Sequence, residues 1–129
     1  MECKSCKCAR ITLIYTGEYS EKMNQLEIMG NYQKAFETVN QRPYYISENH
    51  DKKYGIWYCQ TQWIIGLNSE RGQCQGFAYV NSSSDCFYCN IAFGWRFLLK
   101  EEGWELANNG DFNIKCNYQS RLMLLLKNV

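Results

Sequence analysis

The sequence has little proline, little histidine and almost no net charge, and these shortages exclude several classes of protein. Of 129 residues, one is proline and one is histidine, while 14 are basic and 13 are acidic. Neither sign of charge forms a long run, so the counterion release that drives nucleic-acid binding has no obvious source, and a polybasic membrane surface is disfavoured too. No apolar stretch approaches the roughly 18 residues that a membrane-spanning helix needs. We expect neither a nucleic-acid partner nor membrane insertion.

Recognisable catalytic motifs are also missing. The single histidine, His50, lies among Asn49, Asp51 and two lysines, which is the usual setting of a solvated surface side chain. No motif places a serine or cysteine nucleophile near it. Glu101 and Glu102 are adjacent in a predicted turn, whereas a carboxylate acid–base pair needs facing positions across a substrate. We predict that the chain is not an enzyme and carries no cofactor.

The chain is instead rich in cysteine, and an even number of cysteines favours four disulfides and a secreted protein. Asn81, in Asn81-Ser82-Ser83, is accordingly a candidate glycosylation site. The N-terminus MECKSCKCAR has no hydrophobic region of about 7–15 residues, so we expect either a leader that this sequence lacks or a cytoplasmic protein with reduced thiols. The eight candidates for disulfide bonding are Cys3, Cys6, Cys8, Cys59, Cys74, Cys86, Cys89 and Cys116.

Two CxxC pairs allow a different chemistry. Cys3 and Cys6 form one pair and Cys86 and Cys89 the other, and four thiolates can chelate a tetrahedral zinc ion. The two pairs are about eighty residues apart, much farther than in a zinc ribbon. Neither pair follows a strand and opens a helix, as a thioredoxin-type redox site would. We favour disulfides without a metal and keep the four-thiolate zinc site as the alternative.

Short β-branched and aromatic runs recur between turn residues and predict an all-β fold. A chain of this length fits one domain, so we predict a single cysteine-rich β domain over residues 1–129, with a core at 8–117 and a tail at 118–129. Its strands should form an antiparallel meander that builds a sandwich or barrel, with possible short helices near 20–29 and 119–128. Glu101-Glu102-Gly103 is predicted as a hairpin loop with glycine in the left-handed conformation. The predicted strands are 11–15, 32–39, 44–47, 54–59, 63–66, 76–81, 95–100 and 112–117.

Aromatic residues make up 16% of the chain and supply both a core and a candidate contact surface. Each ring buries roughly 150–250 Å², so most of them should lie inside. Strand alternation over residues 54–59 places apolar side chains on both faces, which suggests a sandwich or a closed barrel. Rings left outside could stack on a ligand, and the candidate binding residues are Trp57, Trp63, Trp104 and Tyr45.

Several short motifs follow one another along the chain: Met29-Gly30-Asn31-Tyr32, Asn40-Gln41-Arg42-Pro43-Tyr44-Tyr45, Ile56-Trp57-Tyr58, Trp63-Ile64-Ile65-Gly66, Ala78-Tyr79, Cys86, Trp95, Trp104 and Ile114-Lys115-Cys116. In this order they resemble a small cysteine-containing β module of secreted or multidomain invertebrate and protist proteins, with the pattern MG-x-Y, N-x-RP-x-Y, YY, W-x-IG, AY, C, W, W and I-x-V-x-C. The module has no established activity.

The resemblance covers residues 8–116 and implies a Cys8–Cys116 disulfide between the first and last strands. The chain departs from the module in two ways. Phe87 stands where the module usually has proline, and five cysteines lie outside its pattern: Cys3, Cys6, Cys59, Cys74 and Cys89.

We therefore expect a secreted, non-catalytic, lectin-like binding module that recognises a glycan or an extracellular protein. A secreted defence or venom factor would share this chemistry and differ only in its target. The alternative from another class is an intracellular structural or assembly component of a larger complex, with free or zinc-binding cysteines.

Overall fold

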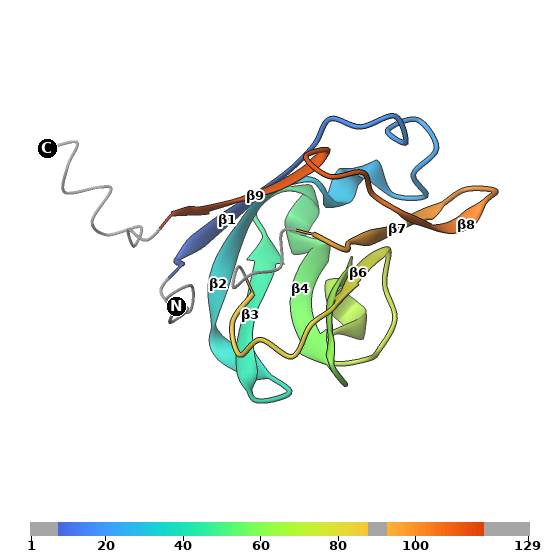
Figure 1. Cartoon of the computed structure of the whole chain (residues 1–129). Helices are drawn as coiled ribbons and strands as arrows, with labels where there is room; N and C mark the ends of the chain where they lie inside the picture. The colour runs from blue at the N-terminus through green and yellow to red at the C-terminus, as the bar shows by residue number, and fades with distance from the viewer. Residues whose placement is uncertain (1–7, 88–92, 118–129) are drawn as a thin grey trace, which may run out of the picture.

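The computed structural model describes residues 8–87 and 93–117 and contains one sheet of nine antiparallel strands (Figure 1). This confirms the all-β prediction. The only helical elements in these residues are three single 3-10 turns: η2 (Leu26–Ile28), η3 (His50–Lys52) and η4 (Asn68–Glu70). The strands are β1 (Arg10–Tyr15), β2 (Gly30–Val39), β3 (Arg42–Ser47), β4 (Tyr54–Cys59), β5 (Gln62–Leu67), β6 (Ala78–Asn81), β7 (Arg96–Leu99), β8 (Gly103–Leu106) and β9 (Phe112–Asn117).

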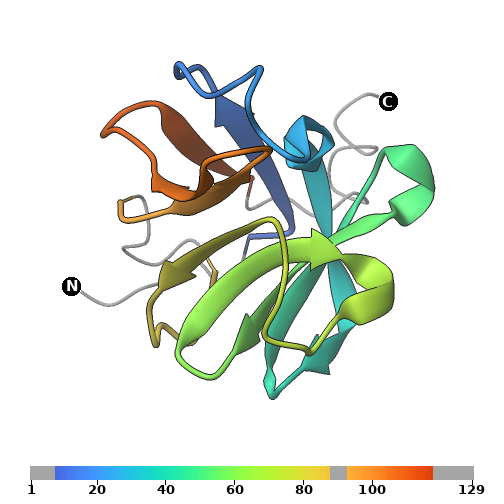
Figure 2. The same ribbon diagram turned by 90° about the vertical axis from the view of Figure 1, so that its right-hand side faces the viewer.

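The sheet is a meander that curls into a half-barrel. Strands β1 to β8 each pair with their neighbours in sequence, and β9 returns to pair with β1, giving the order β8-β7-β6-β5-β4-β3-β2-β1-β9. The strands β8 and β9 lie at opposite ends of this order, although only residues 107–111 connect them. Five residues span at most about 20 Å, so the sheet must curl to bring its two edges together (Figure 2).

Tight turns set the register of this meander. Asn40 and Gln41 join β2 to β3 with φ of 52° and 67°, and Gln60 and Thr61 join β4 to β5 with φ of 45° and 66°. Two successive left-handed residues make a type I′ turn, whose twist matches that of the flanking strands. The predicted hairpin at 101–103 is also present, and Gly103 has a φ of 79°.

The predicted helical turns within residues 20–29 are limited to η2. Met23 forms an antiparallel bridge with Leu99 of β7, so this segment runs partly as extended chain. The helix was expected from the spacing of Met23, Leu26 and Met29, but of these three only Met23 is buried, and Leu26 is 44% exposed. The second predicted helix, at 119–128, lies outside the described residues.

Inside the curl lies the inner core, a set of buried side chains contributed by every strand except β8. Aromatic rings make edge-to-face or tilted contacts through it, and each such pair contributes about 0.5–1.5 kcal/mol beyond its buried area. The centroid distances are 5.6 Å for Trp63–Phe87, 5.8 Å for Phe87–Trp95, 5.3 Å for Trp95–Phe112 and 5.1 Å for Phe97–Phe112.

A second, smaller apolar cluster lies on the outer face of the sheet. This outer core consists of four buried residues on β3, β4 and β5, namely Tyr44, Trp57, Cys59 and Ile64. It exists because all six residues of β4 are buried, so the strand has apolar contacts on both faces. The predicted alternation over residues 54–59 is therefore confirmed.

Two disulfides connect described cysteines. Cys8 and Cys116 are bonded with Cα atoms 5.5 Å apart, which links the chain before β1 to β9, as the resemblance implies. Cys59 and Cys74 are bonded with Cα atoms 5.4 Å apart, which links the end of β4 to the connection between β5 and β6.

Candidate functional site

Three of the four aromatic residues expected to contact a ligand are buried, so the prediction was wrong for them. Trp63 and Tyr45 belong to the inner core and Trp57 to the outer core. Their polar atoms are used internally: Trp57 donates to the Gln73 carbonyl at 2.8 Å, Trp63 to the Ser84 carbonyl at 3.0 Å, and Tyr45 to the Cys8 carbonyl at 2.8 Å. They were misplaced because sequence alternation does not show what covers each face of a strand.

Trp104 is the one binding candidate that remains accessible. It lies on β8 at an edge of the sheet, and 41% of its surface is exposed. Its ring meets that of Tyr79 on β6 with centroids 4.9 Å apart and an interplanar angle of 75°. Because β7 lies between these two strands, the contact crosses a strand and fixes the Trp104 ring over the outer face.

These two rings line a surface pocket of about 210 Å³. Its floor is the outer face of β5 and β6, and one wall is the connection between them. The pocket combines apolar surface with two amide side chains and has no charged residue in its lining, which comprises Gln62, Ile64, Cys74, Gln75, Gly76, Ala78, Tyr79 and Trp104.

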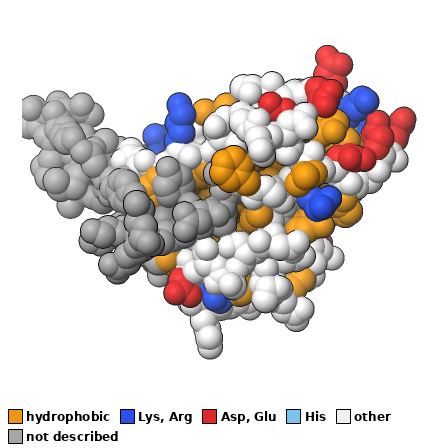
Figure 3. Space-filling model, viewed as in Figure 1, with side chains coloured by type: hydrophobic (Ala, Val, Ile, Leu, Met, Phe, Trp, Pro, Cys, Tyr) orange, Lys and Arg blue, Asp and Glu red, His pale blue; other side chains and the backbone are white. Residues whose placement is uncertain are grey.

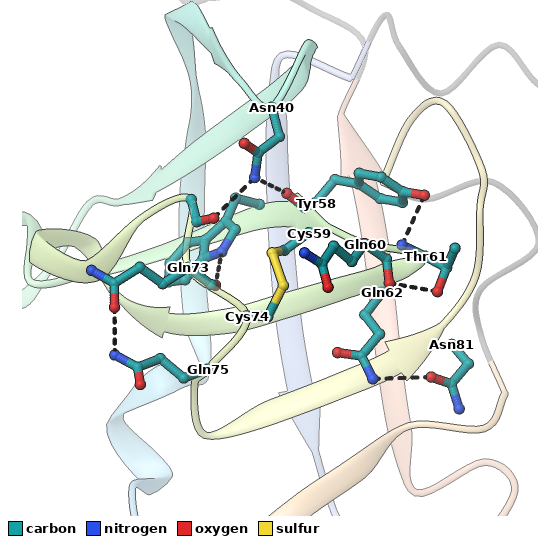
Figure 4. Close-up of a disulfide and its surroundings, with 12 residues drawn as sticks. Asn40, Tyr58, Cys59, Gln60, Thr61, Gln62, Gln73, Cys74, Gln75 and Asn81 are labelled. Atoms are coloured by element: carbon teal, nitrogen blue, oxygen red, sulfur yellow. Dashed lines mark hydrogen bonds between the residues drawn. A yellow bond between two sulfur atoms is a disulfide. The ribbon is translucent and has the colours of Figure 1, made fainter.

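The wall of the pocket is held against the sheet at several points (Figure 4). The Cys59–Cys74 disulfide attaches it to β4, and the Trp57 indole donates to the Gln73 carbonyl. Asn40 donates to the Gly72 carbonyl at 3.1 Å and to the Tyr58 carbonyl at 2.7 Å. The connection is therefore part of the folded body and shapes the pocket before any ligand arrives.

Gly66 and Gly76 allow the connection to lie this close to β5. A Cβ atom added to Gly76 would lie 2.6 Å from the Ile64 Cγ2 atom and 2.6 Å from the Ile65 carbonyl oxygen. A Cβ atom added to Gly66 would lie 2.9 Å from the Trp57 ring and 3.0 Å from the Gly76 Cα atom. Glycine is required at both positions because the backbone packs directly on backbone and ring.

The two amides of the pocket have defined partners. Gln75 donates from Nε2 to a Glu70 carboxylate oxygen at 3.0 Å and to Gln73 Oε1 at 2.8 Å. Gln62 donates from Nε2 to Asn81 Oδ1 at 3.2 Å. Among the described residues the carbonyl oxygens of both side chains have no hydrogen-bond partner, so each offers an acceptor.

The binding residues predicted from the sequence did not include Gln62, Gln75 or Tyr79. A signal for Tyr79 was present, because alternation through 78–80 places it on the face opposite the buried Ala78 and Val80. No signal for the glutamines was present, since only the folded connection brings Gln75 near Trp104.

Asn81, the candidate glycosylation site, is exposed at the end of β6. Its neighbour Gln62 lines the pocket, so the sequon lies at the pocket's rim.

A second surface has a different character. Phe36 on β2 is fully exposed, at an irregularity where the register between β2 and β3 shifts. The groove beside it has a volume of about 380 Å³ and mixes charges of both signs, from Lys34, Glu37, Glu48 and Lys52.

The cysteines do not support the predicted alternative of a four-thiolate zinc site. Cys86, one of its four proposed ligands, is disulfide-bonded and cannot serve as a thiolate ligand. The other three, Cys3, Cys6 and Cys89, lie outside the described residues. Within the described residues no three histidine, cysteine or carboxylate side chains gather in a way that could hold a metal ion.

The titratable side chains considered for catalysis are exposed, and none of them lines the pocket. His50 is exposed and its ring meets that of Tyr54 edge-on at 6.1 Å. Glu102 forms an ion pair with Lys22 at 3.5 Å. Figure 3 shows charged side chains of both signs gathered at the β7–β8 side of the molecule. The pocket therefore offers ring stacking and hydrogen bonding.

In residues 8–87 and 93–117, no helix has the length and apolar character needed to cross a membrane. Comparison of the chain with protein-family models, with curated proteins and with solved structures gave no match.

Proposed function

We propose that this chain is a non-catalytic binding module of the extracellular space and that it recognises a glycan in the pocket beside Trp104. The single observation that carries the proposal is the exposed Trp104 ring, held by Tyr79 above a pocket with two free amide oxygens. An aromatic face can pack against the C–H face of a sugar, while amides can bind its hydroxyl groups. Such a site needs correctly placed rings and hydrogen-bonding groups, and it needs no reactive group.

The disulfides support an extracellular location. Disulfides persist in oxidising compartments and are rare in the cytosol, and among the described cysteines none is free. Alkylation of the unreduced protein followed by mass analysis should detect no free thiol. Eight alkylated cysteines would instead support the intracellular alternative.

Tryptophan emission tests the glycan site directly. The other three tryptophans, Trp57, Trp63 and Trp95, are at most 1% exposed, so iodide quenching reports mainly on Trp104. Titration with a sugar panel should shift the emission and protect Trp104 from iodide. Trp104→Ala lacks the reporting ring, so its binding is measured by isothermal titration calorimetry; it should be weaker at least about tenfold, because a central aromatic contact often contributes about 2 kcal/mol or more.

Leu106→Ala is the matched control for this substitution. Leu106 lies on the same strand and is similarly exposed, at 47%, but it does not line the pocket. It should leave binding within about twofold. A flat response across the whole panel, or equal losses in the two variants, would contradict glycan binding at this site.

A protein ligand is the second candidate, and the fully exposed Phe36 favours it. Aromatic anchors carry much of the binding energy of protein interfaces, and Phe36 lies beside a groove. If this candidate is right, Phe36→Ser will abolish retention of an extracellular binding partner while Trp104→Ala retains it.

A further inference from the structure

We infer that the ligand of the Trp104 pocket is an uncharged sugar, whose hydroxyl groups donate hydrogen bonds to the side-chain carbonyl oxygens of Gln75 and Gln62. This inference rests on the proposed function and specifies its ligand class. It follows from the direction in which the two amides are held and from the charges around them.

The orientation of the Gln75 amide is determined by its partners. Both of its N–H groups point to acceptors, the Glu70 carboxylate and the Gln73 side-chain oxygen. Flipping the amide would place its oxygen against these two oxygens and lose both hydrogen bonds. The Gln75 Oε1 atom is therefore an acceptor in the native structure, and a ligand that contacts it must donate a hydrogen bond to it.

Gln62 presents a similar acceptor on β5. Its Nε2 donates to Asn81, and its Oε1 is turned away from Asn81 in Figure 4. The pocket consequently has two carbonyl acceptors and an aromatic face, with one remaining N–H on Gln62. Hydroxyl groups on a ring with C–H faces can satisfy this set, because each hydroxyl both donates and accepts.

Charged ligands fit the same set poorly. A sulfate or carboxylate has no proton to donate at neutral pH, and it would meet two carbonyl oxygens with the Glu70 carboxylate behind Gln75. A quaternary ammonium group could stack on the rings but cannot donate a hydrogen bond. Arg96 is paired in register with Tyr79 and Leu106, and its positive charge near the rings would repel such a cation.

The test is a titration of the folded protein, followed by Trp104 emission, with four kinds of probe: neutral oligosaccharides, sulfated oligosaccharides, sialylated oligosaccharides and choline. We expect neutral sugars to bind, with a dissociation constant that changes less than twofold between 50 and 300 mM salt, since no ion pair forms. Charged probes should bind at least about tenfold more weakly.

Two variants and a control locate the contacts. Gln75→Leu and Gln62→Leu each remove one acceptor at similar volume and should weaken binding about three- to tenfold, the usual effect of one hydrogen bond. Gln33→Leu, on β2 beside Phe36, should have no effect. Circular dichroism of each variant verifies that the fold is retained.

The outcomes separate this inference from the proposed function. Preferential binding of a sulfated or sialylated sugar that calorimetry shows to be lost in Trp104→Ala would overturn the uncharged ligand and leave glycan recognition standing. Unchanged affinity for a neutral sugar in both glutamine variants would overturn the assigned contacts. Binding of choline alone, or of no probe, would overturn the inference and glycan recognition together.

Discussion

The inner and outer cores are built from the same residue types but have different structural roles. The inner core gathers side chains from eight strands within the curl, and the Cys8–Cys116 disulfide links the chain before β1 to the adjacent strand β9. The outer core has four buried residues from three adjacent strands; the connection between β5 and β6 is bonded to it, and Ala35, Val39, Ile46 and Tyr79 pack around it. The inner core thus makes the fold, whereas the outer core attaches the wall of the candidate pocket.

This contrast shows why β4 is apolar on both faces. Tyr54, Ile56 and Tyr58 enter the inner core, while Trp57 and Cys59 hold the connection in place. A meander sheet that exposed its outer face to water would have polar residues at these positions. The extra apolar layer therefore marks the region where a pocket is built on the outside of the sheet.

The largest expected effect is the loss of unfolding free energy when a disulfide is removed, and this loss should differ between the two disulfides. Replacing Cys8 and Cys116 with serine removes a link across 108 residues, and the chain-entropy model predicts a loss of about 4.7 kcal/mol for a loop near this length. Replacing Cys59 and Cys74 removes a link across 15 residues, for which the same model predicts about 3 kcal/mol. Denaturant unfolding of both double variants measures these losses.

The two double variants should also differ in sugar binding. The Cys59/Cys74 variant should lose binding under conditions where it is still folded, because the pocket wall is released. A Cys59/Cys74 variant that binds as well as the unchanged protein would show that the wall does not depend on this disulfide.

A smaller effect is expected at Gly76, where the connection packs on β5. Gly76→Ala should destabilise the protein by about 1–3 kcal/mol, since the new methyl group meets the backbone of Ile65 at 2.6 Å. Gly55→Ala on β4 is the control, because its nearest contact is the Tyr45 carbonyl oxygen at 3.3 Å. Urea midpoints that fall equally for both substitutions would contradict the close packing of the connection on β5.

The smallest effect is a pH dependence that distinguishes adjacent residues of β3. Burial raises the pKa of Tyr45, whose hydroxyl donates within the inner core, and burial raises the pKa of Tyr44 in the outer core to a lesser degree. Above pH 10 the unfolded chain ionises its tyrosines while the folded chain keeps its protons, so the free energy of unfolding falls as pH rises. Each fully protected tyrosine contributes a slope of at most about 1.4 kcal/mol per pH unit.

Tyr45→Phe should reduce this alkaline loss more than Tyr44→Phe does. Unfolding by urea between pH 9 and pH 12 gives both slopes. Equal slopes for the two phenylalanine variants would mean that the two hydroxyl groups are buried alike.

Local patterns predicted much of the fold because they act through neighbours in the chain. Alternation over residues 54–59 revealed a strand with two apolar faces, and the loop before Trp104 was recognised from the left-handed glycine that such turns favour. The two-residue turn at Gln60 and Thr61 was missed, since neither residue is a typical type I′ residue.

The candidate site was predicted only in part, through Trp104. The remaining tryptophans could not be assigned to inside or outside, because burial depends on which distant segment covers a given face. Trp57 illustrates this: its cover is the connection that carries Gln73, a contact made sixteen residues away.

The sequence by itself determined eight of the nine strands, the absence of strong charge and the abundance of cysteine and aromatic residues, all of which follow from composition and short-range spacing. The tertiary structure alone decided that the sheet curls into a half-barrel, that Cys59 pairs with Cys74 and that Trp104 stays outside. The physical reason is that these features depend on contacts between segments far apart in the chain. Only the folded backbone brings such segments together.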